Sequence, residues 1–195
     1  MLSSKIFVLV GSSGSGKSTL VKRLLKKDNK DIFYSVSVTS RKKRKGEKEG
    51  KDYYFVSKEE FKKMIRGKKL LEWTFTYGNY YGTPKESFKS ALKEGRKILM
   101  DLDINGAKKI KEKFKEQSKI ILVLPPSFFT LRKRLERRNK KEATYRLAAD
   151  KNFWEEVLKN KKIFDYYLLN DDLKETVENL KVIIKAEDLK EMPKI

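Results

Sequence analysis

The stretch GSSGSGKS, residues 11–18, decides the fold. It matches G-x-x-x-x-G-K-[ST], a loop whose glycines let successive backbone N–H groups point at a phosphate. The apolar run KIFVLV before it predicts a buried strand, and apolar residues at helical spacing after it predict an amphipathic helix. In this context we expect Lys17 to reach the β- and γ-phosphates of a nucleoside triphosphate and the Ser18 hydroxyl to bind Mg²⁺.

The loop alone leaves two classes of protein open. A GTPase or motor ATPase uses the triphosphate to change shape, whereas a small kinase passes the γ-phosphoryl group to an acceptor. The choice between the two classes depends on residues outside the loop.

Apolar runs that suit strands alternate with segments that suit helices. Further strands are predicted at 97–103, 119–126 and 164–170, and FYSVSV at 33–38 is expected to be extended. Helix starts are predicted at 57–60, 83–86, 127 and 172–175, with Pro84 as a first helical residue and Gly95 just past that helix's end. The alternation predicts an α/β fold, a three-layer core whose parallel sheet is covered on both faces. The polar, turn-rich segment at about 35–83 breaks the rhythm and predicts an inserted subdomain.

Composition excludes some kinds of chemistry and leaves others open. The 195 residues are 38% hydrophobic, enough for a core, and contain no cysteine and no histidine. Any chemistry therefore depends on carboxylates, lysine, arginine and backbone amides. No apolar run can span a bilayer, and the first residues lack the pattern of a signal peptide, so we expect a cytoplasmic protein without membrane contact. The net charge of +21 fits a nucleic acid partner, a small phosphorylated substrate, or merely solvated helix surfaces.

Several blocks resemble the guanylate kinase family, in the correct order over essentially the whole chain. They are SVSVTSRKKRKGEKEGKDYYFVS, LLEWTFTYGNYYGTPKESF, ILMDLDINGA, PPSFFTLRKRLERR and YLLNDDL. The resemblance implies a P-loop kinase that uses ATP and Mg²⁺ to convert GMP to GDP. It implies a single domain, 1–195, with a core at 1–34, 84–133 and 150–195, a GMP-binding subdomain at about 35–83 and a short lid at about 134–149. The residues expected at the ATP phosphates are Gly11, Ser12, Ser13, Gly14, Ser15, Gly16, Lys17, Ser18 and Thr19.

The acceptor site is expected to hold a phosphate at one end and guanine at the other. Arg41 and Arg44 are three residues apart, close enough to grip one phosphate monoester from a turn, and the Tyr53 hydroxyl can join them. The lysines between the two arginines supply only general positive potential. A carboxylate suits guanine because N1–H and the 2-amino group are both donors, and adenine lacks that amino group. By the resemblance, the residues that bind GMP are Ser37, Arg41, Arg44, Tyr53, Glu72, Tyr81, Thr83 and Asp103.

The remaining predictions concern the metal, the lid and the ATP base. Asp101 ends an apolar strand, where a carboxylate can act on Mg²⁺ through a bound water together with Ser18. Lid arginines in nucleotide kinases of this type neutralise charge on the transferring group, which assigns catalytic roles to Lys17, Arg41, Arg134, Arg138 and Arg146. Asn170 resembles a residue of the loop beside the ATP adenine.

The chain departs from the family pattern at three places. Lysines replace the usual prolines of the arginine loop, Asn105 replaces a glutamine, and the lid is shorter, so that assigning Arg146 requires a deletion of a few residues. Three alternatives remain: a catalytically inactive guanylate kinase-like binding module, a P-loop kinase for another phosphorylated acceptor, and a nucleic-acid binder motivated by charge alone. We expect GMP and ATP as partners, no specific nucleic acid, and a monomer or homodimer.

Overall fold

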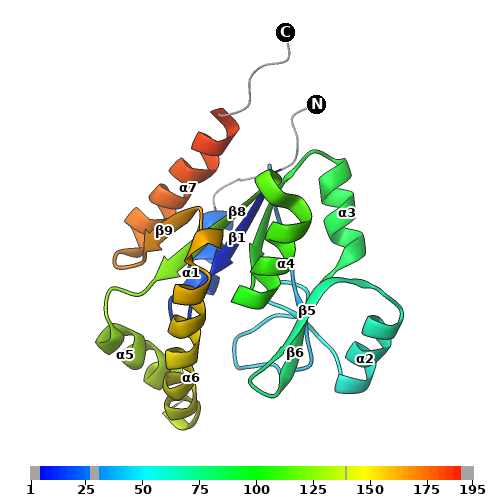
Figure 1. Cartoon of the computed structure of the whole chain (residues 1–195). Helices are drawn as coiled ribbons and strands as arrows, with labels where there is room; N and C mark the ends of the chain where they lie inside the picture. Colours follow the sequence, from blue (N-terminus) through cyan, green and yellow to red (C-terminus); the bar gives the residue numbers. More distant parts are fainter. Residues whose placement is uncertain (1–4, 27–30, 139, 190–195) are drawn as a thin grey trace. The chain divides into compact units, whose positions relative to one another are not determined.

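The computed structural model describes residues 5–26, 31–138 and 140–189 (Figure 1). By their internal contacts they form two compact units, which are described one at a time. The first unit takes its described residues from 3–8 and 30–118, and the second from 9–29 and 119–195.

A five-stranded sheet has the order β2-β7-β1-β8-β9. Every residue of β1 (Ile6–Val10) is buried, as expected of a strand with both faces covered, and its residues divide between the two units after Val8. In the first unit β2 (Ile32–Tyr34) pairs in parallel with β7 (Lys97–Asp101). In the second, β9 (Tyr166–Leu169) pairs in parallel with β8 (Ser118–Leu124). The predicted α/β class with a parallel sheet is confirmed.

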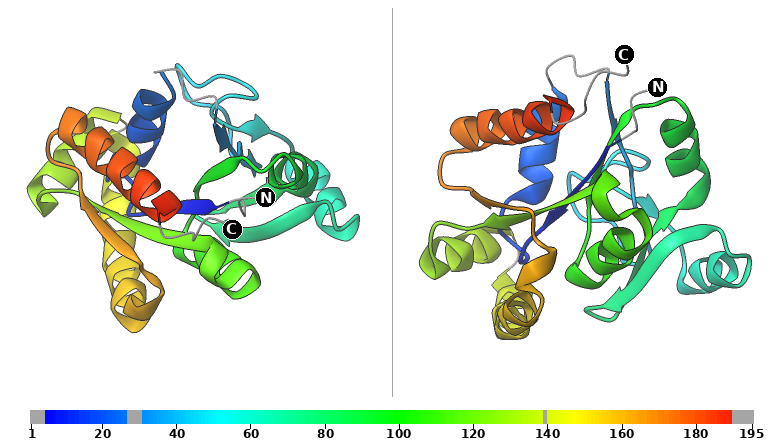
Figure 2. Two further views of the ribbon diagram at one scale, coloured as in Figure 1. Left: turned by 90° about the horizontal axis from the view of Figure 1, so that it is seen from above. Right: turned by 45° about the horizontal axis from the view of Figure 1, so that its top comes forward.

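The first unit contains a second sheet in the order β4-β3-β6-β5. Its strands are β3 (Val38–Thr39), β4 (Tyr54–Phe55), β5 (Leu70–Thr76) and β6 (Asn79–Pro84). The antiparallel hairpin of β5 and β6 turns at Tyr77 and Gly78, which both have positive φ, and it forms the long ribbon beside α2 (Lys58–Arg66) in Figures 1 and 2. The unit also contains α3 (Lys85–Lys93), α4 (Ile104–Phe114) and the 3₁₀ turn η1 (Lys115–Gln117).

The small core of this sheet depends on Phe61 of α2. Phe61 is fully buried with Val38 and Leu70, and its ring stacks on Tyr80 with 5.2 Å between the centroids. Phe61 thereby fastens α2 to the sheet that carries much of the predicted acceptor site.

The second unit is mainly helical. Its elements are α1 (Lys17–Leu25), α5 (Phe128–Arg138), α6 (Lys140–Lys159), the 3₁₀ turn η2 (Lys161–Ile163) and α7 (Leu173–Leu189), besides β8 and β9. Leu131 and Leu135 of α5 pack with Ala143 of α6, while α7 contacts α1. Among the residues that the structure describes, no helix is both long and apolar enough to cross a membrane.

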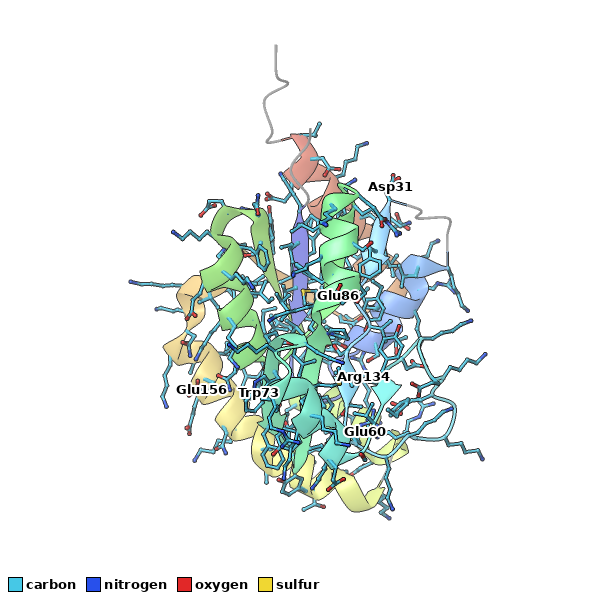
Figure 3. All side chains as sticks on the ribbon, turned by 90° about the vertical axis from the view of Figure 1, so that its right-hand side faces the viewer. Asp31, Glu60, Trp73, Glu86, Arg134 and Glu156 are labelled. Atoms are coloured by element: carbon cyan, nitrogen blue, oxygen red, sulfur yellow. The ribbon has the colours of Figure 1, made fainter. Side chains whose placement is uncertain are left out.

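Most of the predicted helix starts are confirmed by their hydrogen bonds. Ser57 and Glu60, the latter labelled in Figure 3, form a reciprocal capping box, and the Ser127 hydroxyl accepts from Thr130 N. Asp172 accepts from Glu175 N in the same way. One detail is wrong: Pro84 is the extended N-cap of α3 instead of its first helical residue.

Candidate active site

The phosphate loop joins β1 to α1 in the second unit. Gly14 and Gly16 have φ of 93° and 100°, in the region that favours glycine. A Cβ on Gly11 would lie 2.6 Å from the Val123 carbonyl oxygen, and one on Gly16 would collide with the Asn170 amide. Helix α1 has no side-chain cap and no acidic residue in its own first turn, so its sequence leaves the positive end of the helix dipole without a local counter-charge. This end of α1 is therefore suited to an anion.

Lys17 bends back over the loop that precedes it. Its Nζ donates to the carbonyl oxygens of Gly11 at 2.6 Å and Ser12 at 3.3 Å. The ammonium group is therefore held at the loop, where the sequence predicts the phosphates.

Asn170 and Arg134 both hold the loop at Ser15. The Asn170 side chain is buried and donates to the Ser15 carbonyl at 2.7 Å. Arg134, labelled in Figure 3, donates to the same carbonyl at 3.4 Å and to the Asn170 carbonyl at 3.1 Å. The described contacts of Asn170 therefore support the phosphate loop, and its predicted place beside the adenine stays a prediction.

A second arginine reaches the loop from α6. Arg146 donates from Nη1 to the Ser13 hydroxyl at 2.9 Å, so Arg134 and Arg146 both contact residues of the loop. The side chain of Arg138, the third predicted lid arginine, lies outside the described part of the structure.

Asp150 of α6 is a buried carboxylate that the sequence did not single out. Its Oδ2 accepts from Trp154 Nε1 at 3.0 Å, whereas Oδ1 is buried without a hydrogen-bond partner. Burial raises the pKa of Asp150, the hydrogen bond from Trp154 acts in the opposite direction, and the nearby Ser12 hydroxyl adds a smaller lowering effect. Asp150 therefore lies beside the phosphate loop as well.

The first unit carries the predicted acceptor residues, beginning with Arg41. Its guanidinium makes a two-pronged ion pair with Glu47, with Nη2 to Oε1 at 2.9 Å and Nη1 to Oε2 at 3.0 Å. Arg44 Nη1 lies 3.9 Å from Glu47 Oε1. The structure therefore brings both predicted phosphate ligands to one carboxylate.

Two tyrosines close the same corner. The Arg41 guanidinium lies over the Tyr53 ring, 5.2 Å from its centroid, and Tyr53 meets Tyr81 edge-on at 6.1 Å. Burial raises the pKa of Tyr53, so its hydroxyl stays protonated and can donate to a phosphate oxygen. Arg41, Arg44, Tyr53 and Tyr81 thus gather in one unit, as the phosphate end of the predicted site requires.

Glu72 occupies the predicted guanine end. It is buried on β5, and its Oε1 accepts from the Thr83 hydroxyl at 2.7 Å. Burial raises the pKa of Glu72 to about 7, the Asp103 charge adds to the rise, and the Thr83 hydrogen bond opposes both. The predicted helix start at 83–86 made Thr83 a candidate cap of α3, but the cap is Pro84 and the Thr83 hydroxyl donates to Glu72. Its predicted contact with GMP stays a prediction.

Asp103 lies close to Glu72 and already has two partners. Its Oδ2 accepts from the Thr74 hydroxyl at 2.6 Å, and its Oδ1 caps α4 by accepting from Gly106 N at 2.8 Å. A Cβ on Gly106 would lie 2.9 Å from Glu72 Oε2, so glycine leaves room beside that oxygen. Ser37 is buried one residue before β3.

The two predicted metal ligands fall in different units. Asp101 ends β7 in the first unit, and Ser18 lies in the first turn of α1 in the second. Their joint action on Mg²⁺ stays a prediction. No cluster of three or more potential metal-ligating side chains occurs among residues 5–26, 31–138 and 140–189.

Comparison with known proteins identifies the family. The guanylate kinase family model matches residues 3–187 of this chain. The chain belongs to the guanylate kinase family. A curated guanylate kinase of Carboxydothermus hydrogenoformans is 40% identical over 185 residues, which cover 95% of this chain and 89% of that protein. One of Prochlorococcus marinus is 43% identical over 184 residues, covering 93% of this chain and 97% of that protein.

Solved structures agree with this assignment. Guanylate kinase from Anaplasma phagocytophilum has a TM-score of 0.75 and 35% identity, covering 96% of this chain and 87% of that one. Shikimate kinase from Bacteroides thetaiotaomicron has a TM-score of 0.51 at 14% identity, covering 93% and 98%, and shares the fold alone. The resemblance to guanylate kinase seen in the sequence is confirmed.

Three residues of the candidate site were not predicted from the sequence. Glu47 holds Arg41, Thr74 holds Asp103, and Asp150 lies beside the phosphate loop. Glu47 was the most accessible to prediction, because Arg41, Arg44 and Glu47 recur every third residue within one short turn. Thr74 lies 29 residues before its hydrogen-bond partner Asp103, and Asp150 lies 138 residues after Ser12 of the loop; no local pattern marks either proximity.

Proposed function

We propose that this chain transfers the γ-phosphoryl group of ATP to GMP and releases ADP and GDP. The observation that carries the proposal is that one unit holds both a corner with two arginines and two tyrosines and a buried carboxylate. Arg41 and Arg44 make the corner, and Glu72 with Asp103 makes the acidic end. A GMP-binding role explains both ends, because the nucleotide presents a phosphate on one side and two guanine donors on the other.

The acceptor needs little covalent help from the protein. The GMP phosphate is already anionic and can attack without losing a proton to a base, which is consistent with a chain that contains no histidine. Arg41, Arg44 and the two tyrosine hydroxyls would hold that phosphate. Glu72 would accept from the guanine N1–H and 2-amino group once it is ionised.

The ATP phosphates would be bound by the phosphate loop and by the arginines that contact it. The glycine loop and the first turn of α1 would hold the ATP phosphates, and Lys17 would move from the Gly11 carbonyl to the β- and γ-phosphates. Arg134 and Arg146 already contact the loop and would neutralise charge on the transferring group, with Arg138 as a third predicted cation.

Magnesium fits the oxygen ligands available. Ser18 would bind the ion directly and Asp101 through water, an arrangement that agrees with the preference of Mg²⁺ for few protein ligands beside substrate phosphates. When bound, Mg²⁺ neutralises phosphate charge.

The wider predictions are retained here as proposals. They comprise a core at 1–34, 84–133 and 150–195, a GMP-binding subdomain at about 35–83, a lid at about 134–149, a cytoplasmic location, and a monomer or homodimer. The alternatives receive less support. Lys17 and Ser18 are those of a working phosphate loop, and a different acceptor or a nucleic acid would not explain the buried Glu72.

A coupled assay of ADP release with GMP, AMP, CMP and UMP tests the proposal. GMP should be preferred over AMP by at least about 1000-fold in kcat/KM, because adenine would leave buried polar groups unpaired. ADP release that ignores GMP would point to an ATPase, and the absence of ADP release with every acceptor would point to an inactive binding module.

One pair of variants tests the acceptor corner. Arg41→Ala should lower kcat/KM for GMP by about 100-fold or more, since a forked donor to the phosphate is lost. Lys42→Ala is the matched control: its backbone carbonyl accepts from Arg41 and is kept, so the loss should stay below about threefold. Equal losses would mean that the whole basic run acts as a diffuse charge.

A further inference from the structure

Glu47 is a half-buried carboxylate among residues that are predicted to bind the phosphate of GMP. The exposed fraction of its side chain is 16%, and that of its partner Arg41 is 9%. Besides the pair to Arg41, Glu47 Oε2 accepts from Arg44 N at 2.8 Å, and Glu47 N donates to the Arg44 carbonyl at 3.1 Å. A single carboxylate therefore ties together the two arginines that are predicted to hold the GMP phosphate.

The donors of Arg41 can be counted one by one. Nη1 gives one N–H to Glu47 Oε2 and the other to the Lys42 carbonyl at 2.7 Å. Nη2 gives one N–H to Glu47 Oε1. The Nε–H group is buried and has no hydrogen-bond partner. In the planar guanidinium, Nε–H and the second Nη2–H lie side by side on one edge, spaced to receive two phosphate oxygens.

The aromatic rings around Arg41 limit how its plane can turn. The guanidinium carbon lies 5.2 Å from the Tyr53 ring centroid and 5.6 Å from that of Phe55. Glu47 binds one edge of the guanidinium, and the two rings restrict the rotation of its plane. A buried donor without a partner costs about 1–3 kcal/mol, so an oxyanion that accepted from the Arg41 Nε–H would stabilise the edge that Glu47 does not bind.

We propose that Glu47 is a positioning residue that holds Arg41 by its outer edge and presents the Nε–Nη2 edge to the phosphate of GMP. The inference rests on the proposed function. Burial alone would raise the pKa of Glu47, but the hydrogen bonds from Arg41 and Arg44 N outweigh it and lower the pKa, so Glu47 stays ionised.

The alternative role for Glu47 is that of a competing anion. A carboxylate beside a phosphate repels it, so a Glu47 that acted through charge alone would weaken GMP binding, and its removal would lower the KM for GMP. If Glu47 positions Arg41, removing it should instead raise the KM for GMP. Steady-state kinetics can therefore separate the two roles.

The test is a double-mutant cycle with the full chain. Glu47→Gln should raise the KM for GMP about tenfold and leave the KM for ATP within about twofold, since a charge-assisted pair is lost at the acceptor end only. In an Arg41→Lys background no guanidinium remains to be positioned, so Glu47→Gln should change the KM for GMP by less than about twofold. Glu59→Gln, which removes an exposed charge from α2 of the same unit, is the matched control and should change neither KM.

A second variant separates the effect of the Glu47 charge from the effect of its position. Glu47→Asp keeps the charge but shortens the side chain. A positioning role predicts a raised KM for GMP in this variant, whereas a role through charge alone predicts an unchanged KM. Thermal unfolding of each variant checks that it is folded.

The following results would overturn the inference. A KM for GMP that is unchanged or lowered by Glu47→Gln would contradict positioning, and so would equal increases in both KM values or in both backgrounds. Each of these outcomes leaves the proposed function standing. A wild-type chain without GMP-dependent turnover would reject both.

Discussion

Glu72 combines burial, a hydrogen bond and a shifted pKa in one side chain. Its pKa is raised to about 7, chiefly by burial, and guanine requires the ionised form. GMP binding should therefore weaken as the pH falls: the KM for GMP should rise about tenfold from about pH 8 to about pH 6. Initial rates across this range measure the change.

Glu72→Gln is the control for this pH profile. The GMP phosphate itself titrates near pH 6, and the variant retains that titration while it loses the one at position 72. The variant should bind GMP more weakly at every pH and show a flatter profile. Identical profiles for the two proteins would mean that Glu72 is not the group that titrates.

The same side chain predicts how stability depends on pH. Because the pKa is raised on folding, the folded state prefers the protonated acid, and the stabilisation present below the ordinary value of 4.5 is lost as the pH rises through about 7. Relative to wild type, Glu72→Gln should gain about 1–3 kcal/mol in free energy of unfolding between about pH 4.5 and about pH 8. Urea denaturation at the two pH values measures it, and a constant difference would contradict a raised pKa.

For single residues, the sequence predicted which side chains of the acceptor site lie close together, but it did not predict which of them form ion pairs. Arg41, Arg44 and Tyr53 were predicted on one phosphate, and the structure brings them together around Glu47. The ion pair depends on a turn that brings the Glu47 carboxylate to the edge of the Arg41 guanidinium. It also depends on the burial of Arg41, which favours a carboxylate as its partner. Neither property follows from spacing alone.

Among the elements, α2 depends most visibly on its first residue. Ser57 Oγ accepts from Glu60 N at 3.1 Å, and Glu60 accepts from Ser57 N at 2.7 Å. Ser57→Ala should lower the free energy of unfolding by about 1 kcal/mol, because an N-terminal donor of the helix loses its acceptor. Lys58→Ala, next in the chain and exposed, should change it by less than about 0.5 kcal/mol. Equal effects would show that the cap does not stabilise α2.

Local signals predicted most of the elements because caps and apolar runs act over short distances. The helix starts at Ser57, Ser127 and Asp172 are confirmed, and Gly95 follows α3 with a φ of 69°. Thr83 shows where such signals fail. Its spacing suits a cap, but the buried carboxylate of Glu72 takes its hydroxyl, and β6 extends through Pro84.

For the whole molecule, the excess of positive charge has a kinetic consequence. A net charge of +21 should attract anionic nucleotides over distances that salt shortens. The kcat/KM for GMP should fall several-fold between about 20 and about 200 mM salt, and the fall should come mainly from the KM. A kcat/KM that does not change with ionic strength would show that the lysine excess plays no part in capturing the substrate.

The organisation of the chain was the least accessible to prediction. The sequence divides the chain by composition into a core, a subdomain at about 35–83 and a lid. Contacts instead group it into two units, and the boundaries between their segments fall after Val8, between residues 29 and 30, and after Ser118. Composition marks where the chain changes character, but contacts between distant segments depend on the sheet order, which no local pattern contains. The three-part division stays a prediction.

The central claim is that the phosphoryl group of ATP goes to GMP. Phosphorus NMR of a mixture of the protein, ATP, Mg²⁺ and GMP follows each phosphate directly. We predict that the two phosphate signals of GDP appear in equal amount to ADP, with little inorganic phosphate. ADP that forms with inorganic phosphate and without GDP would contradict the claim.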